Sequence, residues 1–105
     1  MATVEAALAL TALVAVVVLC AGALLAAAAQ VRCVDAAREA ARLTARGDTE
    51  RAVPVARGVA PSGAEVTVRV DGDLVIAMVS ARSPLLPITV RAEAVAAREP
   101  GEVDE

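Results

Sequence analysis

The chain of 105 residues contains no phenylalanine, tyrosine, tryptophan, histidine or lysine, although 58% of it is hydrophobic. Aromatic side chains normally fill soluble cores, line ligand pockets and stack on nucleic-acid bases. Histidine and lysine supply the commonest general bases, Schiff-base amines and metal-binding imidazoles. A net charge of −3 also gives no basic footprint for nucleic acid. The composition therefore predicts a protein that is not an enzyme, with no cofactor, metal, nucleic acid or small-molecule substrate.

The few residues left for chemistry form weak patterns. Asp71 and Asp73 have the spacing of a metal-binding DxD pair. An Asp-Gly step between two apolar runs is, however, far more typical of an ordinary hairpin turn. The chain has no glycine-rich phosphate-binding loop either. These observations favour a structural or binding role over catalysis.

A long run without charge lies near the N-terminus, over residues 6–31. As a helix with a rise of 1.5 Å per residue it would be about 39 Å long, which exceeds the ~30 Å hydrocarbon core of a bilayer. Residues 6–25 include ten leucines or valines, which together favour insertion by roughly 3–6 kcal/mol. The sequence therefore predicts a hydrophobic transmembrane and assembly helix over residues 1–31.

Charged residues at helical spacing follow this run without any helix breaker. Arg38, Arg42 and Arg46 form an i, i+4 stripe, and Asp35 and Glu39 each precede an arginine by three residues. The glycine that follows the stripe is of the type that ends helices. The pattern predicts that one continuous helix extends from about residue 3 to residue 46, with its second half in water or against a protein partner.

The second half of the chain changes to the period of a β-strand. Apolar residues alternate over residues 65–70, and Asp71-Gly72 is a signal for a two-residue type I′ hairpin. Residues 74–81 are almost all apolar, so we expect a central strand that is covered on both faces. In such a strand Ile76→Asp would bury an unpaired charge and cost several kcal/mol.

A third strand is expected after the RSPLLP loop, because residues 88–94 alternate again with Ile88, Val90 and Ala92 facing inward. The predicted fold class is α+β, with a long, partly transmembrane N-terminal helix and a small three-stranded antiparallel meander. The expected parts of the chain are the helix over 1–31, its soluble continuation over 32–47, a body of a short helix or turn plus the sheet over 48–97, and a disordered acidic tail over 98–105.

The two cysteines are 13 residues apart. On a continuous helix this spacing is about 20 Å, whereas a disulfide needs Cα atoms within roughly 7 Å. Cys20 and Cys33 therefore cannot pair within one chain. Cys20 is expected to pack as a small residue in lipid, and Cys33 is left as a candidate for a disulfide between subunits.

Glu5 is a lone carboxylate at the start of the apolar run, and two interpretations are open. In the first, Thr3 caps the helix and Glu5 complements the helix dipole among the lipid headgroups. In the second, the carboxylate enters the hydrocarbon and needs a cation, because an unpaired charge there costs several kcal/mol. An α-ammonium group, its own or that of a neighbouring chain, would supply that cation.

The stretches TVEAALAL and QVRCVDAAREAARLTARGD, followed by a small β region, resemble the TadE-like pseudopilins, which are minor pilins of bacterial tight-adherence (Flp-type) type IV pili. The resemblance implies a pilin-like fold and a non-catalytic role in pilus assembly. It also implies that Met1, Thr3, Val4 and Glu5 act in processing and assembly. The partners implied are the bilayer, other pilin subunits and the assembly machinery, together with a prepilin peptidase if a leader precedes Met1.

The orientation in the membrane depends on what precedes Met1. Arginines 32, 38, 42 and 46 lie after the uncharged run and, taken alone, favour a cytoplasmic body. A basic leader removed before Met1 would reverse this. In that case the N-terminus lies on the cytoplasmic side of the cell membrane and the body lies outside, where it enters the pilus.

Two other functions remain open. Ala27-Ala28-Ala29 satisfies the A-x-A pattern, so the chain could be a small secreted protein whose signal peptide is cleaved after Ala29. The chain could also be a single-pass accessory subunit of another membrane complex. In that case the arginine stripe would meet lipid phosphates or an acidic partner.

Overall fold

The computed structural model describes residues 2–83 and 87–98. Its elements are α1 (Ala2–Ala45), α2 (Thr49–Val59), β1 (Glu65–Asp71), β2 (Leu74–Arg82) and β3 (Thr89–Ala97). This arrangement confirms the predicted α+β class, with one long helix before a three-stranded antiparallel sheet. Met1, the middle of the RSPLLP loop and the tail after Arg98 lie outside the described residues.

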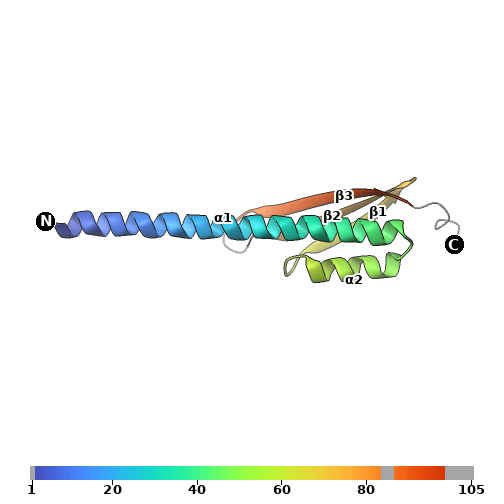
Figure 1. Ribbon diagram of the computed structural model, residues 1–105, viewed down its shortest axis with the longest axis horizontal. Coiled ribbons are helices and arrows are strands. Elements are labelled where there is room, and N and C mark those ends of the chain that lie inside the picture. Colours follow the sequence, from blue (N-terminus) through green and yellow to red (C-terminus); the bar gives the residue numbers. More distant parts are fainter. Residues whose placement is uncertain (1, 84–86, 99–105) are drawn as a thin grey trace.

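The molecule is a rod whose length is set by α1 (Figure 1). Its longest extent is 79 Å and its radius of gyration is 20.1 Å, whereas a compact chain of this length would have a radius of about 13 Å. In Figure 1 the sheet lies along one side of the C-terminal half of α1, and α2 lies along another. The N-terminal half of α1 projects alone, without any other element beside it.

The end of α1 is a Schellman motif built on Gly47. The N–H of Asp48 donates to the Leu43 carbonyl oxygen at 2.8 Å, and the N–H of Gly47 donates to the Thr44 carbonyl oxygen at 3.1 Å. Gly47 has a φ of 93°, a left-handed conformation that side chains with a Cβ rarely adopt. The predicted end of the helix at this glycine is therefore confirmed.

We expect Gly47→Ala to destabilise the folded body by about 1–2 kcal/mol, because alanine is strained in this conformation. Gly58→Ala is the matched control, since Gly58 lies inside α2 and an added Cβ there would meet no atom within 4 Å. The control should be neutral or stabilising by about 0.5 kcal/mol. Thermal unfolding of both full-length variants in detergent measures the difference. Equal melting temperatures would contradict the assigned role of Gly47.

The sheet has the order β1-β2-β3, and both pairs are antiparallel. Asp71 pairs with Leu74, so the hairpin loop consists of Gly72 and Asp73. Gly72 has a φ of 63°, and no non-glycine residue among those described has a positive φ. These values match a type II′ turn, which needs a positive φ only at its first central residue. The predicted type I′ turn at Asp71-Gly72 is wrong by one position, because Asp71 is held in the ladder.

Only one face of the sheet is covered. Along β2, Val75 and Val79 are buried, whereas Met78 is 44% exposed on the opposite face. The prediction of a strand covered on both faces is therefore wrong, because both helices lie on one side of the sheet (Figure 1). Ile76 shares the open face and is half-buried, so it is not the site of greatest sensitivity to charge. Ile88 precedes β3 and is 47% exposed, which corrects its predicted inward position.

Alanine dominates the core between α1, α2 and the sheet. The fully or almost fully buried members on the helices are Ala29, Cys33, Ala36, Ala37, Ala40, Ala41, Ala45, Ala56 and Ala60. Opposite them lie Val66, Val75, Ala77, Val79, Ala81, Val90 and Ala92 of the sheet. Small side chains let the backbones approach closely, so the body forms a core without a single aromatic ring.

Candidate functional site

The first half of α1 presents a continuous apolar surface. The exposed large hydrophobic residues there are Val4, Leu8, Leu10, Leu13, Val14, Val16, Val17, Val18, Leu19, Leu24 and Leu25. Residues 3–24 correspond to about 33 Å of helix, which matches the ~30 Å hydrocarbon core. An apolar surface of this extent marks a site of membrane or protein interaction. By length and composition, α1 is able to cross a membrane.

The polar groups in this segment are few. The Thr11 hydroxyl donates to the Ala7 carbonyl oxygen at 2.8 Å, which satisfies it without water. Glu5 is exposed in the first turn of α1 and makes no ion pair with any described residue. Thr3 and Val4 are exposed beside it. Because α1 begins at Ala2, Thr3 lies inside the helix and does not occupy a capping position.

The predicted charge stripe lies on the exposed side of the C-terminal half of α1. Arg42 holds Glu39 through two hydrogen bonds, of which the Nη2–Oε2 bond measures 2.6 Å and the Nε–Oε1 bond 3.3 Å. An exposed pair of this kind contributes roughly 0.3–0.5 kcal/mol. Asp35, Arg38 and Arg46 are exposed and make no ion pair within residues 2–83 and 87–98. Their charges are therefore available to a partner.

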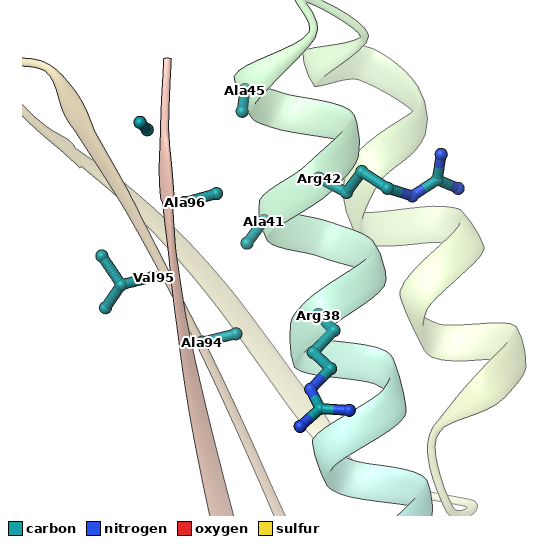
Figure 2. Close-up of a pocket in the computed structure, with 8 residues that line it drawn as sticks. Arg38, Ala41, Arg42, Ala45, Ala94, Val95 and Ala96 are labelled. Atoms are coloured by element: carbon teal, nitrogen blue, oxygen red, sulfur yellow. The ribbon is translucent and has the colours of Figure 1, made fainter. Parts of the chain in front are cut away.

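A cavity of about 230 Å³ opens between α1 and the edge strand β3. Figure 2 shows Ala41 and Ala45 facing Ala94 and Ala96 across it, while Val95 points away from α1. Arg38 and Arg42 complete the lining. The facing walls are mostly methyl groups, and the Arg42 guanidinium points away from β3 (Figure 2). None of the lining side chains is a nucleophile or a general base.

Cys33 lies in the alanine core with 0% of its surface exposed. Burial raises the pKa of its thiol above the ordinary value, and the nearby Arg32 guanidinium opposes that rise in part. A thiol of a second copy would reach it only if the core opened, which argues against the predicted disulfide between subunits. Cys20 is exposed on the apolar half of α1, and both cysteines are free.

Two polar contacts that tie α1 to the rest of the body were not anticipated from the sequence. The Gln30 amide donates to the Arg91 carbonyl oxygen of β3 at 2.8 Å. Arg32 donates to the carbonyl oxygens of Val59 and Ala60 at the end of α2, at 3.3 and 3.4 Å. The sequence signalled these contacts only by position, since Gln30 lies near the end of the uncharged run and Arg32 is the first charged residue after it.

Among the described residues, no three potential metal ligands lie close enough together to hold an ion. The fold thus defines a class: a small α+β body joined to one helix that is able, by length and composition, to cross a membrane.

The comparison with known proteins identifies the family. Over 98 residues, which make up 92% of this chain and 78% of the relative, the sequence is 54% identical to "Apoptosis inhibitor Rv3655c" of Mycobacterium tuberculosis (strain ATCC 25618 / H37Rv). This chain belongs to the family of that protein. No family model matches the chain, and no solved structure matches it.

The predicted membership of the TadE-like pseudopilins is wrong, because the relative carries a different name and no family model supports the likeness. The pilus-assembly function and the pilus localisation are overturned with it. The processing and assembly roles given to Met1, Thr3, Val4 and Glu5, the pilin partners and the prepilin peptidase came from that likeness. The pairing of Glu5 with an α-ammonium group, which follows from the cost of an unpaired charge in lipid, stays a prediction. The relative supports neither alternative, the accessory subunit or the secreted protein cleaved after Ala29. Ala29 itself is buried within α1.

Proposed function

We propose that this protein is anchored in a membrane by the apolar half of α1 and that its α/β body acts by binding another protein in the inhibition of apoptosis. The observation that carries the apoptotic role is the 54% identity to the apoptosis inhibitor over 92% of the chain. The membrane anchor is supported by the exposed leucines and valines between Val4 and Leu25.

Binding without catalysis is supported by the chemistry that the chain offers. It has no histidine and no lysine, and the groups exposed on the described part of its body include arginines, carboxylates, hydroxyls and apolar side chains. Ion pairing and apolar contact are what such groups supply. Two surfaces suit a protein partner. One is the α1–β3 cavity beside Arg38, which makes no ion pair with the described residues, and the other is the open face of the sheet with Leu74 and Met78.

We further propose that the N-terminus lies on the cytoplasmic side of the cell membrane and the body lies outside. The relative is a bacterial protein named for inhibiting apoptosis, a process of animal cells, and a body exposed outside the bacterium has access to such a target. A C-terminal alkaline phosphatase fusion expressed in a bacterium tests this orientation. The fusion should be active, because the enzyme folds only outside the cytoplasm. An inactive fusion that is nevertheless intact would reverse the orientation.

The apoptotic role is tested by expressing the full-length protein in cultured animal cells that are then treated with an inducer of apoptosis. The wild-type chain should lower the fraction of cells with cleaved caspase substrates. Val75→Asp, which places a charge in the core, should lose this effect, whereas Gly58→Ala, whose added Cβ inside α2 meets no atom within 4 Å, should keep it. Normal apoptosis in cells that contain the folded wild-type protein would contradict the proposal.

A further inference from the structure

A second cavity, of about 330 Å³, lies where the apolar half of α1 meets the body. Its lining residues are Leu25, Ala28, Ala29 and Arg32 of α1, Pro61 and Ser62 of the turn after α2, and Arg82 at the end of β2. The apolar lining residues are Leu25, Ala28, Ala29 and Pro61. Arg32, Arg82 and Ser62 add two guanidinium groups and one hydroxyl, and no carboxylate is among the lining residues.

The position of this cavity along α1 matches the lipid headgroup layer. If Glu5 marks one boundary of the hydrocarbon core, residues 6–25 cover about 30 Å and Leu25 reaches the other boundary. Arg32 then lies about 10 Å farther along the helix, in or just beyond the headgroups. The cavity therefore spans the step from acyl chains to phosphates.

The two arginines differ in how they are held. Arg32 donates through Nε and Nη2 to the carbonyl oxygens of Val59 and Ala60, which fixes its guanidinium and leaves Nη1 without a bond to any described residue. The Arg82 side chain is exposed and makes no hydrogen bond or ion pair within residues 2–83 and 87–98. One oriented and one free guanidinium on the same cavity suit the oxygens of a phosphate group.

We propose that this cavity binds the phosphate group of an anionic phospholipid from the leaflet next to the body. Arg32 and Arg82 contact the phosphate oxygens, the Ser62 hydroxyl donates a further hydrogen bond, and Leu25 and Ala28 pack against the first acyl carbons. The inference rests on the proposed membrane anchoring. A bound lipid at this position would fix the orientation of the body relative to the membrane surface. That orientation determines which parts of α1 and the sheet a partner can reach.

The experiment uses the full-length protein in phosphatidylcholine vesicles that contain spin-labelled phosphatidylglycerol or spin-labelled phosphatidylcholine. The relative association of each lipid with the protein is measured by electron paramagnetic resonance. The wild-type chain should prefer phosphatidylglycerol. Arg82→Gln should lower that preference roughly fivefold, since one arginine near an anionic headgroup contributes about 1 kcal/mol. Arg32→Gln should lower it at least as much.

Arg38→Gln is the matched control, because Arg38 is exposed on the same helix and lines the other cavity. It should keep the wild-type preference. An equal loss in all three variants would overturn the proposal in favour of general surface charge. Loss of the preference on adding inorganic phosphate to the buffer would also overturn it, since the site would then bind free phosphate.

The design also separates this inference from the proposed anchoring. A protein that inserts stably in neutral vesicles but shows no lipid preference refutes the lipid site and leaves the anchor standing. A protein that fails to insert in any vesicle refutes both.

Discussion

Leu13→Arg combined with Val16→Arg is expected to remove the full-length protein from membranes. Residues 6–25 contain ten leucines or valines, and together these favour insertion by roughly 3–6 kcal/mol. Each arginine near the middle of the bilayer costs about 2.5–3.5 kcal/mol. Two arginines therefore cancel or exceed the whole favourable free energy of insertion. The substitutions also remove Leu13 and Val16, two of the ten apolar residues that supply it. No described residue near positions 13 and 16 offers a carboxylate to pair with them.

The measurement is the fraction of protein that stays with the membrane pellet after alkaline extraction. The matched control exchanges the same positions for apolar residues, as Leu13→Val with Val16→Leu, and should behave like the wild-type chain. Retention of the double-arginine variant in the pellet would show that α1 is held by something other than its apolar surface.

Val75→Asp is expected to unfold the body while leaving α1 in the membrane. Val75 is completely buried in β2, where it pairs with Val70 and Ala96 on the face that packs against α1. A carboxylate at this position would have no cation beside it within the alanine core. Such a substitution costs several kcal/mol, which is a large part of the total stability of a body this small.

The control is the next residue of the same strand. Ile76 lies on the open face between Arg69 and Val95, so an aspartate there keeps access to water and has an arginine as its cross-strand neighbour. Ile76→Asp should cost about 1 kcal/mol or less. Limited proteolysis of both variants in detergent distinguishes them, because an unfolded body is cut rapidly. Equal resistance would mean that the assignment of faces in β2 is wrong.

The helices were predictable because their signals are local. The uncharged run, the i, i+4 arginine stripe and Gly47 all lie within α1 or at its end, and none depends on distant contacts. The strands were recognised for the same reason, β1 and β3 by their alternation and β2 by its apolar run. The spacing of apolar residues indicates whether a segment forms a helix or a strand. In this chain the elements indicated by that spacing agree with those in the fold.

The faces of the sheet and the contacts that join the elements could not be read in this way. Residues 74–81 are apolar at both faces, so the sequence alone did not reveal that only Val75, Ala77, Val79 and Ala81 turn toward the helices. The turn moved by one residue because Asp71 pairs with Leu74 in the ladder. The Gln30 and Arg32 hydrogen bonds join residues about 27 to 61 positions apart, and such pairs leave no local pattern.

The mistaken family assignment has a related cause. A Thr-Val-Glu start and an alanine- and arginine-rich helix are features that insertion and helix formation favour in any single anchor, so they carry little information about function. The distinguishing features of the body, such as the cavity beside Arg38 and the cavity beside Arg32 and Arg82, depend on the packed structure. The sequence patterns predicted a long apolar helix before a small sheet, whereas the short motifs in α1 led to the wrong family.

The central claim is that α1 is one rod whose first half lies in lipid and whose second half lies in the protein core. Labelling the two native thiols with a water-soluble maleimide, in unsealed membrane fragments that contain the wild-type chain, tests it most directly. Cys20 should stay unlabelled both before and after urea is added, because lipid covers it. Cys33 should be unlabelled before urea and labelled afterwards, because only the folded body protects it. Labelling of Cys20 in native membranes would contradict the claim.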